Sequence, residues 1–288
     1  MITGRAAIRI GLALATVLAL VACATAPPRA SLTPQQRPAG LVAPPKPAQP
    51  SQASRDLARY YAGVQSDLLT RGLLRTDGGG PDTPYDADDL VENFVTLAFF
   101  EEYTRSAGVS VRGSNESGQL SRWSGPVRIG TEFGPSVSAD IRARDATRIN
   151  AFANRLARVT SHQISVANAA NFHVFVASED DSDFIQTRLK TLVPNISQSE
   201  LDLFANLPRS FYCLVVAVSG TRNPHDYIRA IALIRAEHPD LVRLSCIHEE
   251  ISQGLGLPND SPAARPSIFN DDDEFALLTS HDEKLLSM

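Results

Sequence analysis

Residues 245–260, SCIHEEISQGLGLPND, decide how the rest of the sequence is interpreted. Their hydrophobic spacing predicts a helix, because at 100° per residue one apolar stripe is formed by Leu244, Ile247, Ile251 and Leu255. Glu249 and Gln253 are i,i+4 neighbours about 40° apart, and they share the opposite face with Cys246. The stretch therefore predicts an amphipathic helix with a polar cluster on one side.

Two frames of a metal-binding helix motif can be laid on this stretch. HExxH, in which two histidines bind zinc and the glutamate activates water, would start at His248, but Ser252 stands at its second histidine position. Moving the frame by one residue restores the spacing of HExxHxxGxxH, with the glycine at Gly256. The three histidine positions and the glutamate position then hold Glu249, Gln253, Asn259 and Glu250.

The surroundings of the shifted frame resemble the catalytic domain of metzincin metallopeptidases. Residues 267–270 (SIFN) are similar to the Met-turn, with Phe269 in place of methionine, and residues 278–282 are similar to the start of the terminal helix. Residues 122–127 are similar to the start of the first strand. The chain resembles still more closely a bacterial envelope family, domain-of-unknown-function family 2927, at Cys246, Glu249, Glu250, Gln253, Gly256, Asn259, Asp260 and residues 267–272.

Strand and helix patterns alternate along the chain, which predicts an α/β or α+β protein. The resemblance implies the α+β class, with a twisted mixed sheet and an active-site-type helix in a degenerate metzincin-like domain at residues 121–288. Before it, residues 52–120 are expected to form a helical segment. Helices are predicted at residues 55–74, 86–103, 145–159, 198–205, 239–256 and 280–286. Strands are predicted at residues 127–131, 164–167, 172–176 and 211–218, the last of them buried; residues 227–236 fit either state, and residues 108–119 fit a loop or short hairpin.

The replaced motif residues change the chemistry that the helix can support. Metzincin-type sites use three neutral imidazoles, whereas an amide oxygen is a weak zinc ligand. Without bound metal, nothing lowers the pKa of the water that Glu250 would activate. We therefore expect no zinc cofactor and a pseudo-metallopeptidase. His248 points about 100° away from Glu249, beside the apolar stripe, so we expect it to pack rather than to bind metal.

Three interpretations of the polar cluster stay open. Glu249, Gln253 and Asn259 could hydrogen-bond one another and nearby backbone, which would close a former active site. Their oxygens, with Asp260 or residues 271–273, could instead bind Ca²⁺. Glu249 and Glu250 could also act as acid and base without a metal, although adjacent helix residues point about 100° apart.

Residues 1–22 have the pattern of a lipoprotein signal peptide. Arg5 and Arg9 precede an uncharged run of 13 residues, which is long enough for a signal-peptide core and too short to span a bilayer. The run ends in LVAC, which resembles the lipobox of bacterial lipoproteins and implies cleavage before Cys23 and acylation of that cysteine. An ordinary secretory signal is the alternative. A neutral residue at Ala24 favours the outer membrane, with the protein facing the periplasm.

The remaining N-terminal residues and the cysteines fit an exported protein. Residues 23–51 are rich in proline, alanine and glutamine, and they predict a disordered tether. With Cys23 acylated, Cys213 and Cys246 are the cysteines that remain. An even number in an oxidising compartment favours one disulfide between them over two buried free thiols.

The composition of the 288 residues narrows the classes of function. A 43% hydrophobic and 20% charged chain is neither a disordered polymer nor a disulfide-framed miniprotein, and no apolar run reaches the ~20 residues of a transmembrane helix. A net charge of −5 with dispersed basic residues gives no reason to expect nucleic acid as a partner. We expect a lipid-anchored, non-catalytic binding or scaffold module for a peptide or an envelope polymer. The alternative is an envelope peptidase or peptidoglycan hydrolase that uses Glu250 with an oxygen-rich metal site.

Overall fold

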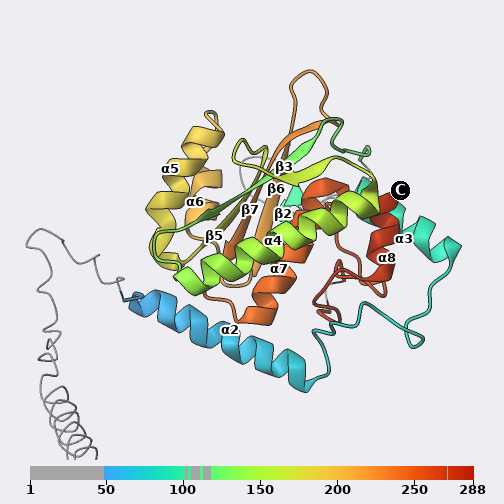
Figure 1. Ribbon diagram of the computed structural model, residues 1–288, viewed down its shortest axis with the longest axis horizontal. Helices are drawn as coiled ribbons and strands as arrows, with labels where there is room; N and C mark the ends of the chain where they lie inside the picture. The colour runs from blue at the N-terminus through green and yellow to red at the C-terminus, as the bar shows by residue number, and fades with distance from the viewer. Residues whose placement is uncertain (1–48, 101–102, 105–110, 113–117, 271) are drawn as a thin grey trace, which may run out of the picture. The chain divides into compact units, whose positions relative to one another are not determined.

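The computed structural model describes residues 49–100, 103–104, 111–112, 118–270 and 272–288, which belong to one compact unit (Figure 1). The expected signal peptide, Cys23 and almost all of the tether lie outside these residues. The described α-helices are α2 (Gln52–Thr70), α3 (Ala87–Phe99), α4 (Ala139–Thr160), α5 (Ser182–Leu192), α6 (Gln198–Ala205), α7 (Asp240–Gly256) and α8 (Ser280–Ser287). None of them has both the length and the hydropathy that a bilayer-spanning segment needs.

A five-stranded mixed sheet forms the centre of the fold, in the order β4-β3-β5-β7-β6. The strands are β3 (Val127–Phe133), β4 (Ile164–Val166), β5 (Phe172–Ala177), β6 (Cys213–Ser219) and β7 (Tyr227–Arg235). The first four in the order are parallel, and β6 runs antiparallel to β7 at one edge. A separate antiparallel pair joins β1 (Tyr103–Thr104) to β2 (Val111–Arg112). The mixed α+β class expected from the sequence is confirmed.

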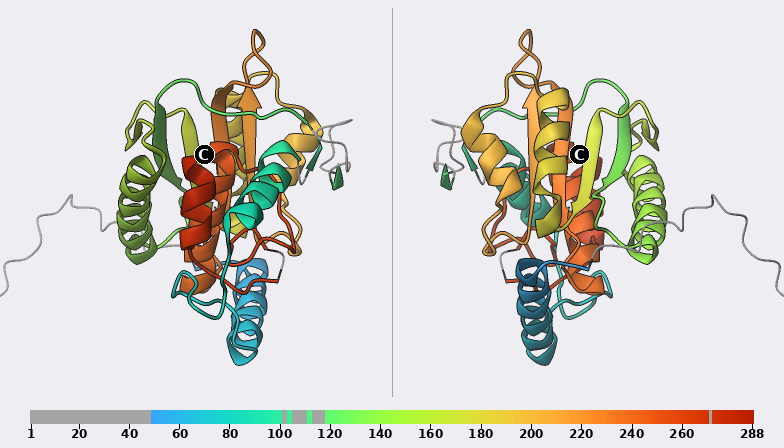
Figure 2. Two further views of the ribbon diagram at one scale, coloured as in Figure 1. Left: turned by 90° about the vertical axis from the view of Figure 1, so that its right-hand side faces the viewer. Right: turned by 90° about the vertical axis from the view of Figure 1, so that its left-hand side faces the viewer.

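Helices cover both faces of the sheet, as the two side views in Figure 2 show. α4 and α7 pack on one face, where Ile149 and Phe152 of the first helix and Ile247 and Ile251 of the second are at most 3% exposed. α5 and α6 pack on the other face around Phe175. The residues of β5 alternate between these two cores, and all six are buried because the strand has neighbours on both edges.

The N-terminal helices pack against the elements around the sheet. Tyr61 of α2 is fully buried; its ring lies edge-on to His238 at 4.2 Å, and its hydroxyl donates to the Arg209 carbonyl at 3.0 Å. α3 contacts α8 through the Asn93 amide and the His281 ring nitrogen Nε2, which are 3.2 Å apart. Both helices therefore belong to the compact unit that contains the sheet.

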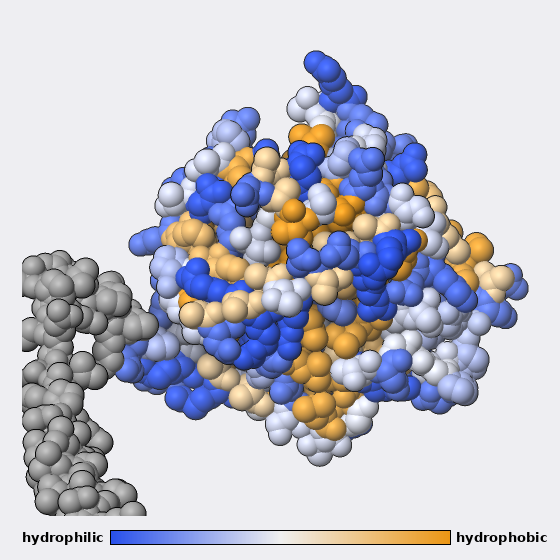
Figure 3. Space-filling model, viewed as in Figure 1, coloured by the Kyte–Doolittle hydropathy of each residue, from blue (hydrophilic) through white to orange (hydrophobic). Residues whose placement is uncertain are grey.

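Charged side chains of α4 pair with the first turn of α7. Arg243 and Asp145 are buried and joined by a 2.6 Å contact, and Asp240 accepts from Arg148 and Arg144 at 2.6 Å each. The hydrogen bond from Arg148 is the main reason that the pKa of Asp240 lies below its usual range. On this face, Figure 3 shows hydrophilic and hydrophobic areas side by side, and one hydrophobic area lies toward the C-terminal end of α2. Leu69, in the last turn of that helix, is 47% exposed.

Several helices and strands of the structure differ from those predicted from the sequence. α4 begins at Ala139, before the predicted residue 145, because the Ser138 hydroxyl caps the helix by accepting from the Ile141 N–H. Residues 227–236 form strand β7, and α5 was not predicted. The prediction of a buried strand at residues 211–218 was wrong in part: β6 is an edge strand in which only Leu214 is buried. Most of the predicted loop at residues 108–119 lies outside the described residues.

Candidate functional site

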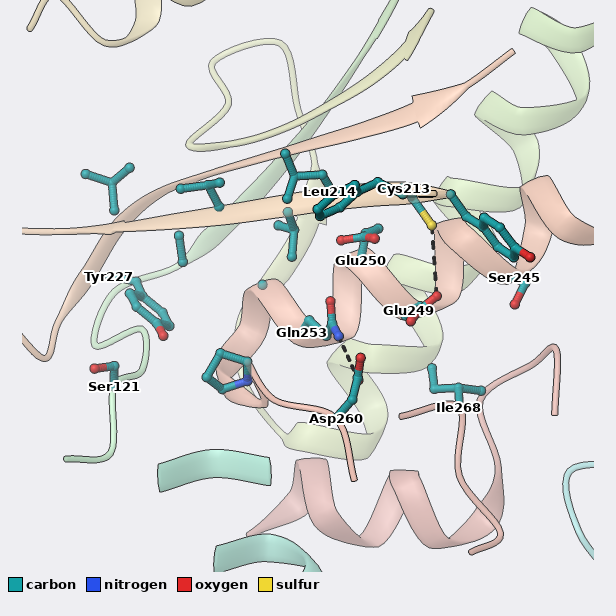
Figure 4. A pocket seen from close by; sticks show the side chains of 18 of the residues that line it. Ser121, Cys213, Leu214, Tyr227, Ser245, Glu249, Glu250, Gln253, Asp260 and Ile268 are labelled. Atoms are coloured by element: carbon teal, nitrogen blue, oxygen red, sulfur yellow. Dashed lines mark hydrogen bonds between the residues drawn. The ribbon is translucent and has the colours of Figure 1, made fainter. Parts of the chain in front are cut away.

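An open pocket of about 830 Å³ lies between β6, α7 and the loop that follows α7 (Figure 4). One wall is formed by every residue from 210 to 220. Opposite this wall, α7 contributes Ser245, Glu249, Glu250 and Gln253. The following loop contributes Pro258, Asp260, Ile268, Asn270, Asp273 and Phe275.

Close packing at the C-terminal end of α7 positions the helix under the sheet. A Cβ atom on Gly254 would lie 2.5 Å from Cζ of Phe172, so only glycine allows this approach. The Trp123 indole N–H donates to the Gly254 carbonyl at 2.9 Å, and its ring stacks on Phe172. Gly256 ends the helix with φ +144°, a conformation that other residues rarely adopt. Gly254, Gly256 and Trp123 therefore determine where α7 lies against the sheet and where it ends.

A disulfide between Cys213 and Cys246 connects β6 to α7, as expected from the number of cysteines. Cys246 is 1% exposed, whereas Cys213 lines the pocket. The bridge therefore fixes one end of β6 to the middle of α7.

Two carboxylates of α7 converge beside this disulfide. The Cys213 sulfur and one oxygen each of Glu249 and Glu250 lie within 4.8 Å of one another. Cys213 Sγ lies 3.9 Å from Glu249 Oε2, and Glu250 is 4% exposed between the helix and the sheet (Figure 4). Although the two residues leave the helix about 100° apart, their side chains thus bring both carboxylates to one pocket.

The other motif residues have different partners. The Gln253 amide N–H donates to Asp260 Oδ1 at 3.0 Å inside the pocket (Figure 4). The Asn259 side chain donates instead to the Thr96 carbonyl at 3.0 Å, and its backbone N–H donates to the Leu97 carbonyl at 3.2 Å. Asn259 is not part of the pocket lining and joins the loop to α3. The structure therefore brings Glu249, Gln253 and Asp260 together and places Asn259 elsewhere.

His248 lies on the buried side of α7, as expected. Its ring stacks on Phe152 with the centroids 4.0 Å apart, and Nδ1 accepts from the Leu278 N–H at 3.1 Å. Burial lowers the pKa of His248 to about 3, so the ring is neutral at neutral pH. His248 therefore packs in the core and accepts a backbone hydrogen bond, and it is not among the residues that line the pocket.

The SIFN segment is connected to α8 by a buried carboxylate. Asp282 is fully buried and accepts from the Ser267 hydroxyl at 2.6 Å, the Ile268 N–H at 3.1 Å and the Thr279 hydroxyl at 2.8 Å. Phe269 is fully buried in the core that α7 shares with α4. Ile268 and Asn270 line the pocket, whereas Phe269 and Asp282 hold the segment from its buried side. Asp271 lies outside the described residues.

Most of the chain matches one known family. The family model DUF2927, a protein of unknown function, matches residues 87–288. The chain belongs to this family. No curated protein and no solved structure matches it. The DUF2927 match begins at α3 and includes the whole sheet, α7 and the pocket.

The DUF2927 domain does not fit the zinc site that the metzincin resemblance implies. Its three ligand positions hold Glu249, Gln253 and Asn259 instead of imidazoles, and the side chain of the third contacts α3. Cys213 is in the disulfide and cannot act as a thiolate ligand. The carboxylates of Glu249 and Glu250 remain as candidate ligands. Two carboxylates bind zinc more weakly than the three imidazoles that such a site requires.

Among the described residues, the charged side chains that line the DUF2927 pocket are all acidic. Its lining contains the four carboxylates of Glu249, Glu250, Asp260 and Asp273, and among the described residues that line it there is no lysine, arginine or histidine. Sequence reasoning missed Tyr212 and Tyr227, which also line it. It also missed the contribution of β6, because a wholly apolar run does not reveal that it lies at an edge.

Proposed function

We propose that the protein is a lipid-anchored component of the bacterial cell envelope whose metzincin-like domain is a non-catalytic binding module. The lipobox-like sequence at Cys23 supports acylation and a position at the outer membrane, facing the periplasm. A mixed sheet with α7 packed across it, carrying the spacing of HExxHxxGxxH, supports the metzincin-like interpretation. The two proposals are independent, since one depends on the N-terminal residues and the other on the pocket.

The observation that carries the binding function is the pocket beside β6. It has a volume of about 830 Å³, within the size range of ligand sites, while the motif positions facing it lack imidazoles. Within the described residues, no strand pairs with the outer edge of β6. An extended peptide or a similarly linear envelope polymer fits such a groove, because peptides bind exposed sheet edges by adding a strand.

The membrane anchor is tested by changing Cys23→Ser. We expect the variant to leave the membrane fraction, because acyl chains on the cysteine would supply the anchoring. A variant that fractionates like the parent protein would contradict the lipoprotein proposal.

Catalysis is tested by incubating the chain from Ala24 to Met288 with isolated peptidoglycan and with a peptide mixture, and analysing products by mass spectrometry. We expect no products beyond those formed by the Glu250→Gln variant. Products that require Glu250 would contradict the non-catalytic role.

One observation favours a second candidate, an envelope peptidase or peptidoglycan hydrolase with an oxygen-rich metal site. Glu249 and Glu250 place carboxylate oxygens within 4.8 Å of each other in the pocket. Oxygen ligands of this kind suit Ca²⁺ better than zinc. This candidate predicts that added calcium stimulates cleavage and that Glu249→Ala removes the stimulation.

A further inference from the structure

The two cysteines of the disulfide between β6 and α7 differ in exposure. Cys246 is 1% exposed and belongs to the core that α7 shares with α4. Cys213 is partly exposed and lines the pocket, where its sulfur points toward Glu249 (Figure 4). Thiol–disulfide exchange requires a thiolate to reach one of the two sulfurs. In the folded protein, the accessible sulfur is therefore that of Cys213.

α7 is held in place by contacts on both sides of the bridge. At its first turn, buried Arg243 is bonded to buried Asp145 of α4 at 2.6 Å. Near its end, the Gly254 carbonyl accepts from the Trp123 indole at 2.9 Å. Cys246 lies between these two points, so opening the bridge should leave the helix where it is.

β6 has less to hold it than α7 has. Among the described strands it pairs with β7 alone, and six of its seven residues are only partly buried. Besides the ladder with β7, the Tyr212 carbonyl just before the strand accepts from His238 Nε2 at 2.6 Å. These contacts keep β6 next to β7 without the bridge. Because elements with few buried side chains open locally at low cost, we expect reduction to loosen this wall of the pocket without unfolding the domain.

The carboxylate of Glu249 favours the reduced state. In the disulfide, Cys213 Sγ carries no proton, so its 3.9 Å contact with Glu249 Oε2 joins two atoms that can only accept. After reduction, the Cys213 thiol has a proton that it can donate to this oxygen. A carboxylate accepts several hydrogen bonds, so this bond adds to the other interactions of Glu249.

We propose that the bridge is a redox switch for the β6 wall of the pocket and that Cys213 is the site at which a dithiol protein attacks. One thiolate of the dithiol bonds to Cys213 Sγ, the S–S bond breaks, and Cys246 leaves as a thiolate that takes up a proton. The second thiolate of the dithiol displaces Cys213 from the mixed disulfide, and Cys213 takes up a proton. Two electrons and two protons thus pass to the two cysteines, and the dithiol becomes a disulfide.

The use of the switch rests on the binding function proposed above, because a loosened wall changes what the pocket can hold. The switch itself is tested without a ligand, on the chain from Ala24 to Met288, which keeps the whole compact unit and has Cys213 and Cys246 as its cysteines. Failure of these tests would leave the binding function standing, and a pocket without a ligand would leave the switch standing.

Two single variants locate the attack. Cys246→Ser leaves Cys213 as the thiol, and Cys213→Ser leaves Cys246. Each folded variant is mixed with dithiodipyridine, an uncharged disulfide that reacts with thiols by the same exchange. We expect Cys213 to react about tenfold faster than buried Cys246. Equal rates, or a faster reaction of Cys246, would overturn Cys213 as the site.

The rate of reduction shows whether the folded protein reacts. Dithiothreitol, a small dithiol, is added to the oxidised chain at several low concentrations of urea. We expect one constant rate, because attack from the pocket needs no unfolding. A rate that rises with urea in step with global unfolding would show that the bridge opens only in the unfolded chain, and the switch would be wrong.

Hydrogen–deuterium exchange measures the wall itself. At labelling times at which β5 stays protected, we expect β6 amides to exchange about tenfold faster in the reduced than in the oxidised protein. The emission of Trp123, the only tryptophan, should not change. The matched control is the double variant Cys213→Ser, Cys246→Ser, which should exchange like the reduced protein with or without dithiothreitol. Unchanged β6 exchange, or loss of β5 protection at the same times, would overturn the switch.

Glu249→Gln tests the carboxylate. With the oxidised and reduced forms of dithiothreitol at equilibrium, we expect the equilibrium constant for reduction to fall about fivefold, because an amide oxygen accepts more weakly than a carboxylate. Glu92→Gln is the control, since Glu92 is exposed on α3 and is not part of the pocket lining. Equal constants in the two variants would overturn the role of Glu249.

Discussion

The first turn of α7 and the middle of the same helix both hold carboxylates, but their surroundings differ. At the first turn, Asp240 is bonded to arginines from α4 and α7, and buried Arg243 is bonded to buried Asp145. In the middle, Glu249 and Glu250 face a pocket whose described lining contains no basic side chain. Oppositely charged side chains hold α4 and α7 together at the first turn of α7, whereas the charged side chains in the described lining of the pocket are all acidic.

The largest effect is expected from breaking the buried ion pair at the first turn of α7. Arg243→Met leaves Asp145, which is fully buried, without its main cation, so we expect the free energy of unfolding to fall by about 3–5 kcal/mol. Arg144→Met is the control, because its pair with Asp240 is 41% and 48% exposed and should change stability by less than about 1 kcal/mol. Urea denaturation measures both. Similar losses in the two variants would remove the distinction between buried and exposed pairs.

The next largest effect is expected from removing the disulfide that lies beside the pocket. Replacing Cys213 and Cys246 by serine should lower the free energy of unfolding by about 3–4 kcal/mol in the chain-entropy model, since the bridge spans a sequence separation of 33. Thiol titration of the non-reduced, denatured protein without Cys23 should find no free thiol. Two reactive thiols would contradict the bridge.

Lowering the pH tests the buried side of the helix. Burial lowers the pKa of His248 and of His238 from 6.5 to about 3, so between these values the unfolded chain binds more protons than the folded one. Stability should therefore fall as the pH falls below 6.5, by at most about 1.4 kcal/mol per pH unit for each histidine. Glu237, whose pKa is raised by burial, partly offsets this loss. Denaturant midpoints that stay constant from pH 7 to pH 5 would contradict burial of the two rings.

The smallest effect concerns Gln253. Gln253→Ala removes its hydrogen bond to Asp260, so we expect a loss of about 1 kcal/mol in the free energy of unfolding and a lower melting temperature. An unchanged melting temperature together with lost ligand or metal binding would show that the residue contacts a ligand instead of holding the loop.

The sequence predicts α7 well because its information is local. The stripe through Ile247 and Ile251 and the glycines at the end of the helix can be read from spacing, and the disulfide was expected from the even number of cysteines that remain when Cys23 is acylated. What could not be predicted depends on distant partners. Asn259 is drawn to α3 by contacts 163 residues away in sequence, and β6 is an apolar run that looks the same at an edge as at the centre of a sheet. The convergence of Glu249 and Glu250 depends on rotamers, which helical angles do not determine.

The central proposal is that the pocket beside the middle of α7 binds a ligand and does not hold a metal ion. It is tested most directly by mass-spectrometric metal analysis of the purified chain from Ala24 to Met288, after dialysis with zinc and calcium and removal of unbound ions. We predict metal far below one equivalent, because two of the three motif positions are amides with other partners. Near-stoichiometric metal that is lost in Glu249→Ala would contradict the account and favour the hydrolase.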